Sequence, residues 1–369
     1  MLRRIFGKPH AVTSDPGQND ALAPDPTPAV AKPADLERAP ALTDRSKVAQ
    51  HRNARGELDY DETMLPWIDQ PDADVDRYVR ALPQVPPGLR NRLEQWRDQG
   101  FVVLEQAIEH RLIDAYVADV KELFEHHRQF SATVGHPKRG TLSISELTDA
   151  EVRDRHLRLV NFHNPSLAAK KLALAGSIID FLEHVFREQV VAMQSLTFRY
   201  GTEQHVHQDY AYVVSGNPSH LAAAWIALED IHPDAGPLGY FPGSHRIPKY
   251  DWGNGLFYVE KESVGSGAQF QDHILSECRK RGVELATFLP RKGDVFLWHG
   301  SLAHGGTPQR DTDRTRLSFV AHYSSVPAFP SSPHDVQHEP QRFELNRGVL
   351  YLDPTKPESE DVFRHGADV

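Results

Sequence analysis

A short motif near the middle of the chain combines an imidazole with a carboxylate. His207 and Asp209 are separated by one residue, and a later segment contains both His299 and His304. Side chains two residues apart in an extended backbone point to the same side, so His207 and Asp209 would lie next to each other. Two imidazoles and one carboxylate are the ligand set of non-haem Fe(II) oxygenases, which leave further coordination positions open. The motif therefore predicts a metal site completed by one of the two later histidines.

The segments around these residues have the pattern of short β-strands. Runs rich in β-branched and aromatic residues are separated by Gly and Pro, which is typical of a β-sandwich or jelly roll. The expected strands are residues 190–200, 210–214, 221–228, 238–241, 286–288, 294–298 and 317–324.

Helices are expected mainly before this β-rich region, where apolar residues recur at helical spacing. The expected helices are residues 74–81, 88–99, 109–129 and 166–187, with strands at 101–104 and 156–162 between them. Their apolar stripes predict that the N-terminal helices pack on one face of the sheet. A further helix over 272–281 is expected inside a polar insertion, 247–285, at the mouth of the pocket.

The chain divides into three parts by composition. Residues 1–56 contain few aromatic residues and no sustained apolar period, so we expect a disordered N-terminal tail. Residues 57–326 form the expected folded domain, and residues 327–369 form a C-terminal extension rich in Pro and charged residues.

The composition of the 369-residue chain is that of a soluble globular protein. Its net charge is −10 without a basic block, which does not suggest a nucleic-acid partner. No run approaches the roughly 18 apolar residues that a membrane span needs. The single cysteine, Cys278, excludes an internal disulfide and favours a reducing compartment, which we take to be the cytoplasm.

Four motifs in order resemble the phytanoyl-CoA dioxygenase family of Fe(II)/2-oxoglutarate-dependent oxygenases. They are HQD at 207–209, GPLGYFPGSHR at 236–246, GDVFLWHGSLAHG at 293–305 and RLSFVAHY at 316–323. The resemblance covers residues 86–325. It implies a mostly β fold with flanking α-helices, in which a double-stranded β-helix (jelly roll, cupin-like) core has the N-terminal helices packed on one face.

The resemblance also assigns the metal ligands. It makes His207, Asp209 and His304 the Fe(II) ligands, because the family's distal histidine lies in a Leu-x-His-Gly segment, here at His304 and not at His299. The remaining positions would take 2-oxoglutarate and O2. The implied reaction hydroxylates an unactivated carbon of a small polar metabolite and releases succinate and CO2.

The far carboxylate of 2-oxoglutarate requires a cation, and an arginine side chain can pair with it through two hydrogen bonds. The family's arginine lies six residues before an aromatic or His position on the last core strand. Counting back from His322 gives Arg316, with Arg314 as the alternative. By the same resemblance or by their place on strands entering the site, three more residues are expected to contact the co-substrate: Trp225, Gln194 and Tyr200.

Two other classes of function remain open from the sequence. A cupin-like metal-dependent isomerase or hydrolase could use the same three ligands for Zn or Mn, and it would not need Arg316. A non-catalytic jelly-roll binding module would have no tight metal site. The predicted mouth of the pocket suggests a polar, anionic or carbohydrate-like ligand through Lys138, Arg139, Lys249, Tyr250 and Trp252.

Overall fold

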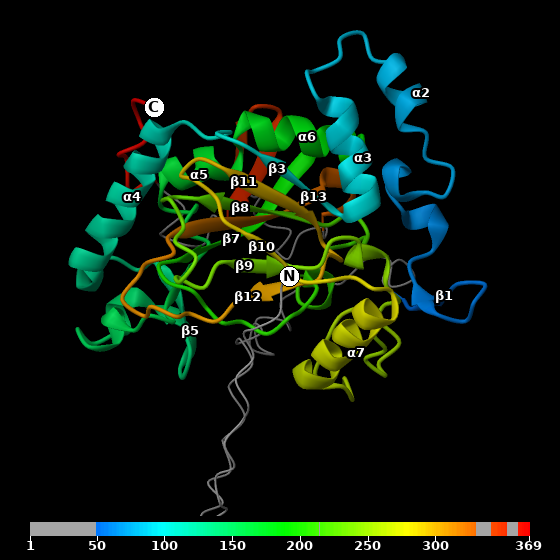
Figure 1. The fold of residues 1–369 in the computed structure, drawn as a ribbon. Helices are drawn as coiled ribbons and strands as arrows, with labels where there is room; N and C mark the ends of the chain where they lie inside the picture. Colours follow the sequence, from blue (N-terminus) through cyan, green and yellow to red (C-terminus); the bar gives the residue numbers. More distant parts are fainter. Residues whose placement is uncertain (1–48, 214, 330–340, 353–360) are drawn as a thin grey trace, which may run out of the picture.

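Two facing β-sheets form the centre of the molecule (Figure 1), as a computed structural model describes it for residues 49–213, 215–329, 341–352 and 361–369. The large sheet runs in the order β3 (Phe101–Leu104), β11 (Val295–His299), β8 (Ala222–Ala227), β13 (Ser318–Ser325), β7 (Val190–Phe198), β6 (Arg158–Val160), β4 (Thr133–His136) and β5 (Gly140–Ser143). The small sheet runs in the order β10 (Ala286–Phe288), β9 (Leu238–Tyr240) and β12 (His304–Gly306). The predicted jelly-roll fold is confirmed.

Alternating side chains of the central strands build two separate cores. On β11, Val295 and Leu297 join the core beneath the helices, whereas Phe296 and Trp298 face the small sheet. This follows from the two-residue period of a strand. Because both faces are covered, these strands are apolar on both sides, and the inner core between the two sheets surrounds the predicted site.

Helices cover the outer face of the large sheet. Figure 1 shows α4 (His110–Glu125), α5 (Leu167–Ala173) and α6 (Gly176–Phe186) on one face of this sheet and the small sheet on the other. The helices α2 (Val75–Arg80) and α3 (Leu89–Gln99) precede β3, and α7 (Gly267–Lys280) lies in the polar insertion. The predicted packing of N-terminal helices on one face is therefore confirmed. No helix in the described part of the chain is long and apolar enough to cross a membrane.

The single helix predicted over 166–187 is wrong, because the chain breaks into α5 and α6. Ala175 has an extended backbone, with φ −57° and ψ 133°. Two side chains capture carbonyl groups released by the break: Tyr323 Oη donates to the carbonyl of Ala173 at 2.8 Å, and Asn346 Nδ2 donates to that of Leu174 at 2.8 Å. The break is therefore stabilised by residues far away in the sequence.

The described parts of the predicted C-terminal extension belong to the same folded unit. The strand β15 (Gly348–Leu352) pairs in parallel with β7, and β14 (Gln341–Leu345) pairs with β15. Phe363 is buried in the core beneath the helices. At the other end, β1 (His51–Arg52) pairs with β2 (Leu58–Asp59), so residues 51 and 52 are part of a hairpin. The rest of the predicted N-terminal tail, residues 1–48, lies outside the described residues.

Candidate metal centre and its cavity

His207 and His304 are held together by their own backbones. His207 N donates to the carbonyl of His304 at 2.9 Å, and His304 N donates to the carbonyl of His207 at 3.0 Å. Residues that exchange both hydrogen bonds in an antiparallel pair carry their side chains on the same face. The two imidazole centroids are accordingly 4.4 Å apart. The bridge brings together two residues almost a hundred positions apart in the sequence.

The glycines after His304 permit this close approach. A Cβ added to Gly305 would lie 2.8 Å from the carbonyl oxygen of Gln204, and one added to Gly306 would lie 2.7 Å from the backbone nitrogen of Glu203. Any larger residue would push β12 away from the segment that carries His207. The Gly-Gly pair therefore sets the separation of the two histidines.

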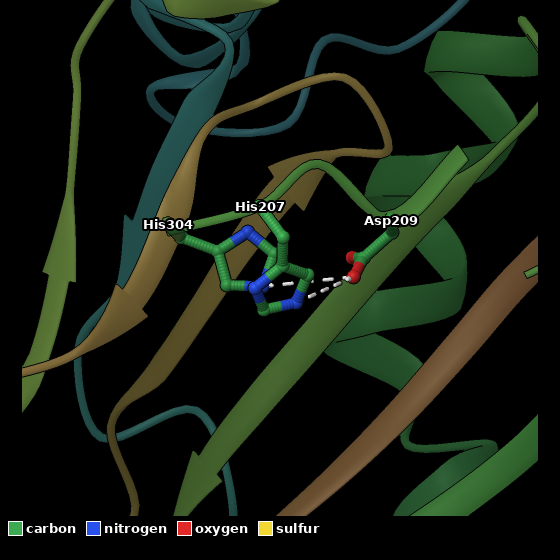
Figure 2. Close-up of side chains that lie close together, drawn as sticks. All are labelled: His207, Asp209 and His304. Atoms are coloured by element: carbon green, nitrogen blue, oxygen red, sulfur yellow. Dashed lines mark ion pairs between the residues drawn. The ribbon is translucent and has the colours of Figure 1, made fainter. Parts of the chain in front are cut away.

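Asp209 is the third member of the candidate metal site, and it directly follows a residue with an extended backbone. Gln208 has φ −123° and ψ 134°, after which Asp209–Ala211 forms the 3-10 helix η7. The Oδ1 atom of Asp209 lies 3.6 Å from Nε2 of His207 and 3.6 Å from Nε2 of His304 (Figure 2). One ligand atom from each of the three buried residues lies within 4.8 Å of the others, a spacing able to hold a metal ion.

Hydrogen bonds orient both imidazoles toward the shared centre. Nδ1 of His207 lies 2.8 Å from the carbonyl oxygen of His205, and Nδ1 of His304 lies 3.0 Å from that of Leu302. A carbonyl only accepts, so each Nδ1 carries the proton and each Nε2 keeps its lone pair. Burial lowers the pKa of His304 to about 4, which keeps this imidazole neutral at pH 7. Nε2 is therefore the nitrogen that each ring turns toward the shared centre.

The second oxygen of the Asp209 carboxylate is occupied on its other side. Its Oδ2 accepts a hydrogen bond from Trp298 Nε1 at 2.8 Å and lies 3.5 Å from Nε2 of His322. Burial raises the pKa of Asp209, but His304 and His322, whose imidazoles gain positive charge at the low pH where this carboxyl titrates, outweigh it and hold that pKa well below its usual value. Asp209 is therefore ionised and presents Oδ1 toward the two ligating histidines.

The triad of His207, Asp209 and His304 opens into a cavity of about 240 Å³, and a buried arginine lines the same cavity. Arg316 lines this cavity and is only 3% exposed. Its Nη1 donates to the carbonyl of Gly236 at 2.9 Å, whereas its Nε has no hydrogen-bond partner among the described residues. Burial lowers the pKa of Arg316 to about 10, which leaves the guanidinium charged at neutral pH. A buried cation with an unused donor fits the carboxylate of a ligand.

The sequence profile described as Phytanoyl-CoA dioxygenase (PhyH) matches residues 96–317, which is more than half of the chain. The chain belongs to the phytanoyl-CoA dioxygenase family. This confirms the family predicted from the four motifs, and it makes the chain an enzyme of the oxygenase superfamily. A search among curated proteins gave no significant match.

Solved structures support the fold of this family member. The alpha ketoglutarate dependent epimerase SnoN from nogalamycin biosynthesis is 17% identical with a TM-score of 0.50, over 73% of this chain and 99% of SnoN. EctD from S. alaskensis, solved with 2-oxoglutarate and 5-hydroxyectoine, is 18% identical with a TM-score of 0.50, over 71% of this chain and 86% of EctD. SnoN has also been solved in complex with Fe3+ and alpha ketoglutarate. At these identities the likeness shows a shared fold.

Most of the other predicted site residues of this family member also reach the cavity. Trp225 and Gln194 line it together with Arg316. Tyr200 does not: it lies in a separate hollow, where the guanidinium carbon of Arg155 is 5.0 Å from its ring centroid. The alternative arginine, Arg314, is exposed and pairs with Asp311 at 2.9 Å.

The rival histidine lies in a different place. His299 is buried at the end of β11, with its Nε2 3.6 Å from Oδ2 of Asp69. Its Nδ1 accepts a hydrogen bond from Ser301 N at 2.9 Å. Both ring nitrogens therefore have protein partners away from the triad.

Sequence reasoning missed several side chains at the site, and two of them are His322 and Arg158. His322 on β13 lies opposite Gln194 of β7, and Nε2 of Gln194 is 3.2 Å from Nδ1 of His322. The spacing along β13 could have shown this. His322 is two residues after Val320, so both side chains point to the same face of the strand. The second is Arg158 of β6, which also lines the cavity. In contrast, none of the five residues expected at the mouth lines it, and Lys249 is buried beside Asp59 at 3.4 Å.

Proposed function

We propose that this chain is an Fe(II)- and 2-oxoglutarate-dependent dioxygenase that hydroxylates an unactivated carbon of a small, polar metabolite and releases succinate and CO2. One observation carries the proposal: the charged, buried guanidinium of Arg316 shares a cavity with the three metal-binding side chains. A buried charge is costly unless a partner neutralises it. The dicarboxylate 2-oxoglutarate supplies such a partner and can also bind the metal.

The residues fit both groups. His207, Asp209 and His304 would hold Fe(II), and Arg316 would pair with the far carboxylate of 2-oxoglutarate. When bound, Fe(II) and 2-oxoglutarate supply with O2 the oxidising chemistry that no side chain provides. The protein orients these groups through the hydrogen bonds at Nδ1 of each histidine and at Oδ2 of Asp209.

The remaining walls of the cavity keep water away from the reacting centre. Trp225, Leu238 and Val320 present apolar surface to the cavity that His207, Asp209, His304 and Arg316 also line. Excluding water strengthens the ion pair expected at Arg316 and limits side reactions.

The two alternatives lack support from this arrangement. A metal-dependent isomerase or hydrolase using the same ligands does not require a buried cation behind the metal, and a non-catalytic module requires neither feature. The fold itself does not decide the reaction, because the similar structure SnoN is described as an epimerase. The mass of the product therefore has to be measured.

The test is succinate formation by the Fe(II)-loaded enzyme across a panel of small metabolites, with product masses recorded. We expect at least one compound to stimulate succinate release and to gain the mass of one oxygen atom. Asp209→Ala should remove this stimulation. Full substrate-coupled turnover by Asp209→Ala, or a product of unchanged mass, would contradict the proposed reaction.

A further inference from the structure

A second, half-buried arginine forms part of the cavity wall. Arg158 lies on β6 in register with Phe198 of β7, and Phe198 lies in register with Ser318 of β13. Residues in register across neighbouring strands face the same side of a sheet. Phe198 lines the cavity, and so does Arg158. The side chain of Arg158 is therefore part of the site, separated from the start of β13 by a full strand.

The direction of the Arg158 side chain is fixed by a glycine. Gly135 of β4 is the register partner of Arg158. A Cβ added to Gly135 would lie 2.8 Å from Nε and 3.4 Å from Cζ of Arg158, so the arginine occupies the space above this glycine. The Arg158 side chain thus lies over Gly135 of β4, on the side of β6 away from β7.

A hydroxyl group lies on the next strand, at the position in register with Gly135. Thr141 of β5 is the register partner of Gly135, and it also lines the cavity. Arg158 and Thr141 therefore stand on the two sides of the bare Gly135 backbone and offer guanidinium and hydroxyl donors to one space. This pairing of donors is suited to the oxygen atoms of an anion.

The charges of the residues that line the cavity also favour a bound anion. Its described lining contains one carboxylate, Asp209, and two guanidiniums, Arg158 and Arg316. With the charges of Fe(II) and the 2-oxoglutarate dianion cancelling, these three described side chains sum to one positive charge. Burial lowers the pKa of Arg158, which reflects the energy needed to keep this charge out of water. An anion bound beside it would reduce that energy.

We propose that Arg158 and Thr141 form a subsite for an anionic group, a carboxylate or a phosphate, of the metabolite that this enzyme oxidises. The inference rests on the proposed function, because it assumes that Arg316 serves 2-oxoglutarate. It defines the substrate class as a small anion held at the β4–β5 end of the cavity.

The test titrates the anaerobic full-length protein, loaded with Fe(II) and 2-oxoglutarate, with three probes of similar size. Benzoate carries a carboxylate, phenyl phosphate carries a phosphate, and benzamide is uncharged. Calorimetry should show binding of at least one anion and much weaker binding of benzamide. Arg158→Gln should weaken that anion about tenfold or more, because a charge-assisted pair is lost. Which anion binds distinguishes a carboxylate substrate from a phosphorylated one.

Variants at neighbouring positions separate the subsite from general electrostatics. Arg158→Lys should retain part of the anion affinity, and Thr141→Val should lose less than Arg158→Gln. Arg139→Gln is the matched control, because Arg139 lies beside the same hairpin but does not line the cavity. It should bind both anions as the wild type does. Circular dichroism reports whether each variant is folded, and the visible band of the Fe(II)–2-oxoglutarate complex reports whether it is loaded.

Three results would overturn the subsite: neither anion binds the wild type, Arg158→Gln binds them equally well, or Arg158→Gln loses the 2-oxoglutarate band. The last result would assign Arg158 to the co-substrate. A wild type without any such band is a different failure, because it would remove the proposed function itself.

Discussion

The indole Nε1 of Trp298 lies 2.8 Å from Oδ2 of Asp209, on the opposite side of the carboxylate from the two ligating histidines. This hydrogen bond fixes which oxygen of Asp209 faces the metal centre. Trp298→Phe removes the donor and keeps most of the volume. Because hydrogen bonds to metal ligands typically contribute about 10–100-fold to metal affinity, we expect a loss of this size for Fe(II). Anaerobic calorimetry measures it, and an unchanged affinity would show that the indole only fills space.

The two candidate histidines should respond differently to truncation. His304→Ala should abolish tight Fe(II) binding, because His304 supplies one of three ligand atoms. His299→Ala should retain the metal but lower the free energy of unfolding by about 1–3 kcal/mol, since it removes a buried side chain that packs beside Trp96 and His245. Metal titration and denaturant unfolding of both variants check this. Loss of metal in His299→Ala with retention in His304→Ala would reverse the assignment.

The strands of the large sheet could be predicted because each is marked by the residue types of a short, local run. Runs such as residues 294–298 are apolar on both faces, and they correspond to β11. The candidate metal ligands could also be proposed from the sequence, since HQD and the later Leu-x-His-Gly segment carry the signal in their residue types. Only the resemblance to the family connected the two segments, because the backbone bridge between His207 and His304 cannot be predicted from either segment alone.

The features that sequence reasoning missed depend on contacts between distant segments. The strand expected over 210–214 does not form in its described part, because Asp209–Ala211 turns the chain directly after the ligand. The short strands β4 and β5 lie in a polar segment, where β4 pairs with β6 and β5 pairs with β4. The position of the Arg158 side chain depends on Gly135, its register partner on β4.

Metal binding should stabilise the fold, because the three ligands come from separate segments and are brought together only in the folded state. A ligand present at about 100 times its Kd raises the free energy of unfolding by about 2.7 kcal/mol. Mn(II), which resists oxidation by air, should therefore raise the melting temperature of wild type, and EDTA should reverse the rise. Asp209→Ala should show no such change. An equal rise in this variant would place the metal elsewhere.

The metal-free protein should lose stability as the pH falls below about 6.5, the usual pKa of histidine. Burial lowers the pKa of His163 to about 3, with a smaller contribution from Lys170 in the same direction. The folded state therefore keeps His163 neutral while the unfolded state binds a proton, so stability is present at higher pH and is lost as the pH falls toward 3. One such group contributes a slope of about 1.4 kcal/mol per pH unit below 6.5.

Denaturant unfolding of the metal-free protein between pH 8 and pH 5 measures this slope. His163→Gln, which has no group that titrates in this range, should show a shallower loss of stability than wild type. Parallel curves for the two proteins would mean that His163 is not held neutral by the fold.

The central claim is that Arg316 binds 2-oxoglutarate at a ferrous centre formed by His207, Asp209 and His304. Adding 2-oxoglutarate to the anaerobic Fe(II)-loaded protein should produce a weak visible charge-transfer band. Arg316→Gln should need at least about tenfold more 2-oxoglutarate to reach half of that band, whereas the exposed Arg314→Gln should titrate as the wild type does. A wild type that binds Fe(II) but shows no band, or an Arg316→Gln titration equal to that of wild type, would contradict this account.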